Sequence, residues 1–251
     1  MLLFASDIDN TLIYSHKKEL NAEKIPCELY EGSNISFITK NTQEKLDYIY
    51  ENSLFVPVTT RSIEQFKRIT FSCWQPKYAI TSNGGSLLID GKPSRQWHDY
   101  FINTIQNAVF ALNKAKELLE NHEYRIYDIK LVDNLFIYTK SSKPEITVDM
   151  LQNSLQNEPV KVYTNFSKVY VVPESIDKGK ALKKFINDYT VSIDNIVSAG
   201  DSIFDIPLLE AANYAIFPDE LPYLHHSDKY IKIPQGELFS DKVVENVIKL
   251  I

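Results

Sequence analysis

The stretch that decides the fold is residues 2–11, LLFASDIDNT, close to the N-terminus. Its apolar half, residues 2–5, predicts a buried β-strand. In an open α/β sheet, ligands bind beyond the carboxyl ends of the strands, so the polar half falls where chemistry is expected rather than packing. The sequence therefore predicts that Asp7 and Asp9 stand at the functional edge of a sheet.

Asp7 and Asp9 form a chemically suggestive pair. Two carboxylates this close repel, and the pKa of one is raised unless a cation lies between them. Mg²⁺ suits such a site because it needs few protein carboxylates and completes its shell with water and phosphate oxygens. Asp7 could then attack phosphorus to give an aspartyl-phosphate, while Asp9 protonates the leaving oxygen and later activates water. The alternative for this pentapeptide is a solvated acidic turn, so the rest of the chain must decide.

Composition narrows the class of protein. The net charge of -6, without any block of Lys or Arg, argues against nucleic acid or an anionic membrane as the main partner. Cys27 and Cys73 are too few for a disulfide framework or a zinc site, which fits a reducing compartment. With no apolar stretch of membrane-spanning length, we expect a cytoplasmic protein, monomeric or homodimeric, that acts on a small molecule.

The order of the predicted elements indicates a core interrupted by an insertion. Residues 1–85 and 173–251 alternate strands and helices, with a loop or flap at residues 13–38. Residues 86–172 instead combine a hairpin around Asp90-Gly91, a long helix at about 99–121 and antiparallel strands. We therefore expect an α/β fold, with a parallel-sheet core and an inserted α+β domain.

Four clusters of polar residues end strands that would share one sheet edge: the Asp7 pair, Thr59, Asn83 and the Asp201/Asp205 pair. A hydroxyl such as Thr59 can bind phosphoryl oxygens, and a lysine such as Lys178 can neutralise charge in a phosphoryl-transfer transition state. Singly, each has an ordinary explanation: Thr59 as a cap, Asn83 as a turn former, Lys178 as a solvated lysine. Their combination favours phosphoryl transfer.

In order and spacing, DIDNT at residues 7–11, Thr59, Lys178 and GDSIFD at 200–205 resemble the four motifs of the haloacid dehalogenase superfamily. The insertion and the turn at residues 82–84 resemble its capped sugar-phosphate phosphatase branch, which includes sucrose-phosphate phosphatase. The resemblance implies a Rossmann-like core of residues 1–85 and 173–251, and a mobile cap of residues 86–172.

The resemblance also implies roles for individual residues. Asp7 would be the nucleophile, Asp9 the acid and base, and Asn83 would lie near the substrate. The residues implied to bind phosphate or substrate are Thr59, Thr60, Asn83 and Lys178; those implied to hold Mg²⁺ are Asp7, the Asp9 carbonyl and Asp201, with Asp205 orienting that shell.

Three positions depart from the pattern of the branch. Asn10 and Thr60 stand where glycine is usual, and Phe204 replaces an asparagine. Thr60 could constrain the phosphate loop, and Phe204 removes a polar group near the metal. The adjacent His225 and His226 lack an evident third ligand, so we interpret them as surface loop residues rather than a metal site.

Together these observations predict a Mg²⁺-dependent phosphatase of a small phosphorylated metabolite, with a sugar phosphate as the expected substrate. Two alternatives stay open. A phosphomutase would use the same nucleophile but return the phosphoryl group to a sugar. A catalytically quiet protein would bind a phosphorylated metabolite for a partner, a possibility that Phe204 keeps open.

Overall fold

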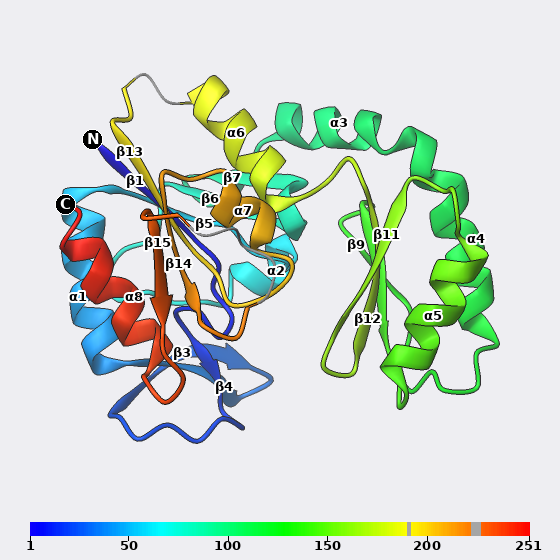
Figure 1. Ribbon diagram of the computed structural model, residues 1–251, viewed down its shortest axis with the longest axis horizontal. Coiled ribbons are helices and arrows are strands. Elements are labelled where there is room, and N and C mark those ends of the chain that lie inside the picture. The colour runs from blue at the N-terminus through cyan, green and yellow to red at the C-terminus, as the bar shows by residue number, and fades with distance from the viewer. Residues whose placement is uncertain (190–191, 222–226) are drawn as a thin grey trace. The chain divides into compact units, whose positions relative to one another are not determined.

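The computed structural model describes residues 1–189, 192–221 and 227–251 (Figure 1). Its contacts divide the chain into two compact units: Met1–Ser94 with Asp177–Ile251, and Arg95–Ile176. The sequence-based boundaries at residues 86 and 172 stay predictions. Both divisions place one continuous insertion within a discontinuous core.

The core unit is built on a five-stranded sheet in the order β15-β14-β13-β1-β5, with every pair of neighbours parallel. The strands are β1 (Leu2–Ser6), β5 (Leu54–Pro57), β13 (Asn195–Ala199), β14 (Tyr214–Pro218) and β15 (Tyr230–Ile233). All five residues of β1 are buried, because neighbouring strands flank it and helices cover both faces. The predicted α/β fold with a parallel-sheet core and an inserted α+β domain is confirmed.

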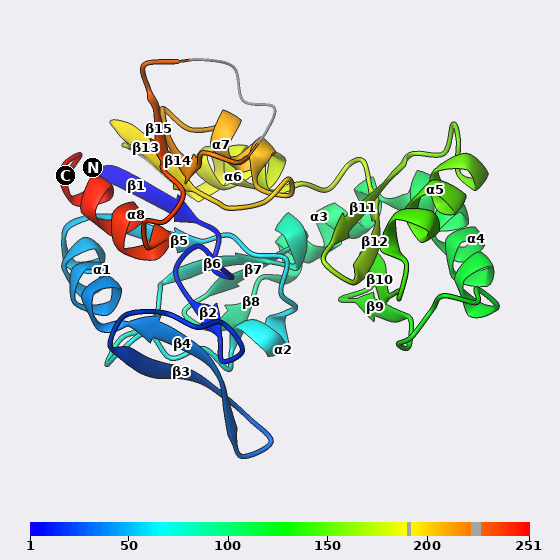
Figure 2. The same cartoon turned by 60° about the horizontal axis from the view of Figure 1, so that its bottom comes forward.

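Helices cover the two faces of this sheet (Figures 1 and 2). On one side α1 (Lys40–Asn52) and α8 (Phe239–Ile248) lie next to each other, and on the other α6 (Lys178–Tyr189) packs with α7 (Ile206–Glu210). The N-cap residue of helix α1 is Thr39, whose side chain accepts a hydrogen bond from the Thr42 backbone N–H.

A short helix, α2 (Ile63–Phe66), follows β5 and begins with the Ser62/Gln65 capping box that the sequence indicates. Beyond it, β6 (Tyr78–Thr81) is joined to the end of β5 by a parallel bridge between Val58 and Ile80. The short 3₁₀ turn η1 (Ser82–Gly84) then leads into the antiparallel strands β7 (Ser86–Ile89) and β8 (Lys92–Pro93). Three successive strand ends, those of β1, β5 and β6, thus lie at one edge of the core.

A loop or flap is expected at residues 13–38, and the irregular loop is wrong. The segment forms a three-stranded sheet, β2-β4-β3, from β2 (Tyr14–Ser15), β3 (Lys24–Tyr30) and β4 (Ser33–Thr39). Its hairpin turns at Glu31 and Gly32, both at positive φ. Pro26 is a residue that normally argues against a strand. It is tolerated here because β3 is an edge strand with a bulge beside it.

The inserted unit is an antiparallel sheet, β11-β12-β10-β9, with helices on one face. Its elements are α3 (Arg95–Thr104), η2 (Gln106–Ala108), α4 (Val109–Glu120), β9 (Lys130–Val132), β10 (Phe136–Lys140), α5 (Pro144–Ser154), β11 (Val160–Asn165) and β12 (Lys168–Pro173). Ile137, Val169 and Val171 pack with apolar residues of α4 and α5. The single helix expected at 99–121 is instead divided between α3 and α4, with Ile105 and η2 between them.

Among the residues that the structure describes, no helix combines the length and the apolar character needed to cross a membrane.

Close packing between α6 and α7 generates a stability prediction. A Cβ on Gly179 would lie 2.1 Å from the carbonyl oxygen of Pro207. Alanine normally favours a helix by about 1 kcal/mol over glycine, but here the clash reverses the sign, and Gly179→Ala should lower the free energy of unfolding by roughly 1–3 kcal/mol. Asn187→Ala, at an exposed position of the same helix, is the matched control and should leave stability unchanged or slightly higher. Urea titration measures both; equal stability of the two variants would contradict the packing argument.

Candidate active site

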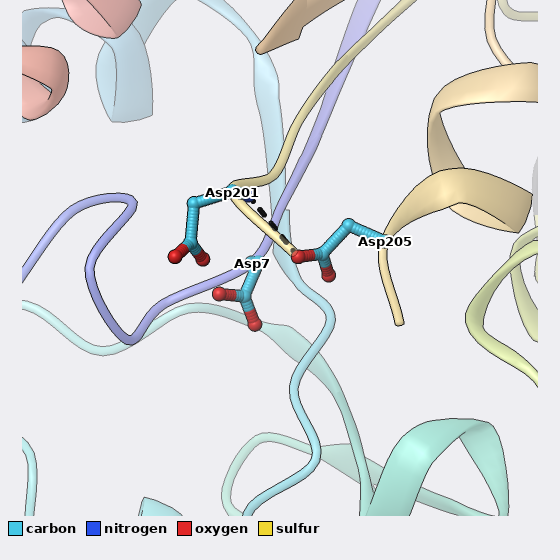
Figure 3. A group of neighbouring side chains, drawn as sticks. All are labelled: Asp7, Asp201 and Asp205. Atoms are coloured by element: carbon cyan, nitrogen blue, oxygen red, sulfur yellow. Dashed lines mark hydrogen bonds between the residues drawn. The ribbon is translucent and has the colours of Figure 1, made fainter. Parts of the chain in front are cut away.

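Three aspartates meet at the carboxyl end of β1. Asp7 extends that strand, its backbone N–H donating to the carbonyl of Ala199 at the end of β13. Asp201 and Asp205 come from the segment that follows β13. One carboxylate oxygen of each lies within 4.8 Å of the others, and Figure 3 shows the three carboxyl groups converging. The structure therefore brings these three predicted residues together.

Lys178, the first residue of α6, is the cation of this cluster. Its Nζ donates to Asp7 Oδ1 at 2.6 Å and to Asp205 Oδ1 at 2.5 Å, and its side chain is only 1% exposed. The positive end of a helix dipole disfavours a lysine at this place, so the two carboxylates supply the compensation. The solvated-lysine interpretation of Lys178 does not hold in this structure.

Asp205 is saturated by hydrogen bonds. Its Oδ2 accepts from the Asp201 backbone at 3.1 Å and from the backbone and hydroxyl of Ser202 at 2.9 and 2.8 Å, while Oδ1 accepts from Lys178. A carboxylate held by four donors is fixed in place and has little capacity left for a metal ion. Its geometry suits the orienting role expected of it.

The carboxylates of Asp7 and Asp201 are held by fewer hydrogen-bond donors than that of Asp205. The Thr11 hydroxyl lies 3.3 Å from both Asp7 Oδ2 and Asp201 Oδ1, and its one proton serves one of them at a time. One carboxylate oxygen of Asp7 and one of Asp201 thus point to the same place, and their negative charge is only partly compensated by hydrogen bonds. The sequence motif alone indicates no role for Thr11.

Electrostatics agrees with that geometry. Burial, followed by the charge of Asp205, raises the pKa of Asp7 to about 7 although Lys178 lowers it. Burial and the charges of Asp7 and Asp205 raise the pKa of Asp201 well above its ordinary value. One ammonium group among three ionised carboxylates leaves two negative charges without compensation, which a hard divalent cation with oxygen ligands would supply. The donor set of Asp7 and Asp201 therefore fits Mg²⁺.

Asp9 has a different environment from Asp7. Its two carboxylate oxygens accept from Arg61, Oδ2 from Nε at 2.8 Å and Oδ1 from Nη2 at 2.7 Å. The Asp9 side chain is 47% exposed and that of Asp7 only 7%. Burial alone would lower the pKa of Arg61, but the charge and hydrogen bonds of Asp9 raise it, so this guanidinium stays charged. The two aspartates of the motif are thus held by two different cations.

The predicted phosphate ligands Thr59 and Asn83 lie beside each other at the ends of β5 and β6. The Thr59 carbonyl accepts from the Asn83 backbone at 3.0 Å, and the Thr59 hydroxyl accepts from the Arg61 backbone at 3.2 Å. Asn83 has φ 56°, and its buried Oδ1 lacks a hydrogen-bond partner among the described residues. Thr60 is half-buried in the turn between Thr59 and Arg61. Binding of phosphate or substrate by these residues stays a prediction.

The departures from the family pattern do not disturb the cluster. Phe204 is buried, and Asp205 beside it still receives its four donors from Asp201, Ser202 and Lys178. His225 and His226 lie outside the described residues.

Two charged residues near Asp9 escaped the sequence reasoning. Arg61 follows the strand-end Thr59 and could have been found by the same argument. Glu28, which contacts Arg61, lies in the segment expected to be a loop or flap, where no sequence pattern indicates an ion pair.

On the inserted unit, the sheet face opposite the helices carries aromatic and basic side chains. Its antiparallel register aligns one row across all four strands, formed by Lys130, Tyr138, Tyr170 and Tyr163. Lys140 and Lys168 form a neighbouring pair. The Lys168 ammonium is 5.7 Å from the centre of the Tyr138 ring. Such a face suits a polar ligand with hydroxyl or anionic groups.

A family model described as haloacid dehalogenase-like hydrolase matches residues 100–217 of the chain. Two curated relatives are called phosphoglycolate phosphatase: one from Nitrosopumilus maritimus is 21% identical over 142 residues, covering 56% of this chain and 57% of its own length. The other, from Methanothermobacter thermautotrophicus, is 22% identical over 117 residues, covering 46% and 52%. The chain thus matches only about half the length of these relatives.

Solved structures share the fold over nearly the whole chain. A sucrose-phosphatase from Synechocystis, in complex with sucrose and phosphate, has a TM-score of 0.65 and 14% identity, covering 99% of this chain and 97% of its own. The C-terminal domain of a trehalose-6-phosphate phosphatase from C. albicans has a TM-score of 0.64 and 11% identity, covering 99% and 91%. These similarities show that the chain shares the fold of these phosphatases, and its residues 100–217 are similar to the haloacid dehalogenase-like hydrolases.

The buried charge cluster predicts opposite stability effects for two of its members. Lys178→Met removes its single cation and should lower the free energy of unfolding by roughly 3 kcal/mol, since it leaves buried carboxylates uncompensated. Asp7→Asn removes one of the repelling charges and should leave the protein at least as stable as the wild type. Both are measured by urea unfolding at pH 8 with a chelator present. A large destabilisation by Asp7→Asn would show that the Lys178–Asp7 attraction outweighs the repulsion.

Proposed function

We propose that the protein is a Mg²⁺-dependent phosphatase of a small phosphorylated metabolite, working through an aspartyl-phosphate. The observation that carries the proposal is the separation of the two motif aspartates. Asp7 is buried and ion-paired to Lys178, while Asp9 is half-exposed and ion-paired to Arg61. Two carboxylates in different environments suit two different chemical roles.

In the first half-reaction, an oxygen of Asp7 attacks phosphorus and the bond from phosphorus to the leaving oxygen breaks. Asp9 donates a proton to that oxygen, so an alcohol leaves and the aspartyl-phosphate remains. Lys178 stabilises the negative charge on the phosphoryl group and the orientation of Asp7, since it already contacts Oδ1. Thr59 and Asn83, at neighbouring strand ends, would hold phosphoryl or substrate oxygens.

In the second half-reaction, water attacks the phosphorus of the aspartyl-phosphate. Asp9 accepts a proton from that water, and the bond between phosphorus and Asp7 breaks to release inorganic phosphate. Mg²⁺, held by Asp7, Asp201 and the Asp9 carbonyl, would neutralise phosphoryl charge and align the reacting groups. Asp205 keeps Asp201 and Lys178 in place through its hydrogen bonds.

The inserted unit supports the proposed substrate class. Residues of the core read the phosphoryl end, so selectivity for the remainder must come from other groups. The face of Lys130, Tyr138, Tyr163 and Tyr170 supports a polyhydroxylated or anionic leaving group, which agrees with a sugar phosphate. The names of the similar proteins, which refer to sucrose, trehalose 6-phosphate and phosphoglycolate, support a small organic phosphate.

A screen of phosphorylated metabolites with the purified protein tests this proposal, with phosphate release as the readout. A phosphomutase would exchange labelled phosphate between sugars without net release. A catalytically quiet binding protein would fail to hydrolyse even a generic aryl phosphate in the presence of Mg²⁺. The saturated Asp205 beside Phe204 favours the enzyme over the quiet protein, because the cluster is built despite that substitution.

Asp7→Asn should abolish turnover, because an amide cannot form the acyl-phosphate, and Asp9→Asn should be almost as damaging. We expect kcat to fall by at least about 1,000-fold for Asp7→Asn, while circular dichroism stays unchanged. Single-turnover assays on p-nitrophenyl phosphate measure the loss. Wild-type turnover by a correctly folded Asp7→Asn protein would rule out the covalent mechanism.

Activity should depend on added Mg²⁺, and Asp201→Asn should raise the concentration that gives half-maximal activity by about tenfold or more, since a weakly chelated ion loses one ligand charge. Ser202→Ala is the matched control: it removes one donor to Asp205 but no carboxylate, so its Mg²⁺ requirement should change little. Full wild-type activity after exhaustive chelation would contradict the metal requirement.

A further inference from the structure

Arg61 belongs to a row of ion pairs that runs from Asp9 through Arg61 and Glu28, in the hairpin of β3 and β4, to Arg68. Beyond its two bonds to Asp9, its Nη1 lies 2.9 Å from Glu28 Oε1, and Arg68 Nε approaches that same oxygen at 3.1 Å. Charges alternate along the chain, so Asp9, Arg61, Glu28 and Arg68 together are neutral. The pairing is therefore complete without any further ion.

Glu28 is the most buried member of the chain, with 1% of its side chain exposed, against 12% for Arg61 and 29% for Arg68. Its second oxygen accepts from the Ser36 hydroxyl at 2.5 Å. A buried carboxylate is costly unless paired, so Glu28 binds Arg61 in one well-defined place. The position of the Glu28 side chain is therefore fixed.

The backbone around Glu28 and Arg61 is also held by hydrogen bonds. Glu28 forms an antiparallel bridge with Ile69, and the Thr70 N–H donates to the Cys27 carbonyl at 2.8 Å, joining β3 to the segment after α2. The backbone of Arg61 is also held, because its carbonyl accepts a hydrogen bond from the Ser82 N–H at 2.7 Å. Arg61 is thus fixed at its backbone and at its guanidinium.

Such rigidity matters for Asp9 in particular. Its side chain is half-exposed, and an exposed carboxylate normally samples several rotamers. A general acid must hold its proton within hydrogen-bond reach of the leaving oxygen, and small errors of position reduce the rate strongly. A planar guanidinium that contacts both carboxylate oxygens sets the orientation of the group, which a lysine cannot do.

We propose that Arg61 is a positioning residue that holds the Asp9 carboxylate in one orientation for proton transfer, and that buried Glu28 from the β3–β4 hairpin fixes Arg61. The role of Asp9 as acid and base rests on the proposed function; the Glu28–Arg61–Asp9 chain rests on the geometry. Arg61 contacts Asp9 and acts through it.

The kinetic test compares two substrates that differ in their need for an acid. p-Nitrophenolate leaves readily without a proton, whereas an alkyl phosphate such as glycerol 1-phosphate needs one. Arg61→Ala should lower kcat by about 100-fold or more for the alkyl ester but about tenfold or less for the aryl ester, with KM changed less than about twofold. Arg61→Lys should show the same pattern, and Glu28→Gln a weaker form of it.

Two additions separate positioning from general loss of structure. Guanidinium ion at millimolar concentration should restore part of the alkyl-ester activity of Arg61→Ala but none in Asp9→Asn. Arg68→Gln, the matched control, removes an arginine that contacts Glu28 but not Asp9, and should keep both activities within about twofold of wild type. Equal losses on the two esters, or a rise in KM with kcat retained, would overturn the proposal.

Crystal structures of the variants decide the question independently of activity. In Arg61→Ala the Asp9 side chain should leave its single orientation, while in Arg68→Gln it should keep it. An unchanged Asp9 in Arg61→Ala overturns the proposal, whatever the kinetics. If the wild-type protein hydrolyses neither ester, the proposed function fails, and the Asp9 orientation in these crystals still decides whether Arg61 and Glu28 position it.

Discussion

The compensation of buried carboxylates by Lys178 is the interaction on which the core depends. Asp7 directly follows β1, an interior strand of the sheet, and its side chain is buried. Lys178 reaches it from 171 positions along the chain and binds Asp205 as well. The sheet must therefore close across the insertion before the charges are balanced. Even then the balance is incomplete, which is a stability disadvantage typical of sites that bind cations.

The second constraint is that two aspartates only two positions apart must behave differently. Their side chains differ in exposure, and the fold supplies a different cation to each. Lys178 pairs with buried Asp7 as a compact point charge, whereas Arg61 pairs with exposed Asp9 as a planar fork. One short motif thus carries two carboxylates in different electrostatic environments.

The inserted unit follows a simpler principle. An antiparallel sheet needs to bury one face, and here α4 and α5 cover the face that contains Ile137 and Val171. Its other face carries Tyr138, Tyr170 and lysines, with the Lys168 ammonium near the Tyr138 ring. The apolar contacts with the helices and the aromatic and basic row therefore lie on opposite sides of the same strands.

The sequence by itself determined the fold class, the insertion and the meeting of Asp7, Asp201 and Asp205, because strand periodicity and the direction of parallel strands carry polar residues at strand ends to one edge. Lys178, at the start of a helix, was indicated by the resemblance of its motif. Only the tertiary structure decided what pairs with Asp9. Glu28 lies in a strand that contains Pro26, a residue that favours a loop in sequence-based reasoning. An ion pair between segments distant in sequence also leaves no local sequence pattern. The strand exists because its edge position and bulge tolerate the proline, a condition that depends on neighbours rather than on the residues themselves.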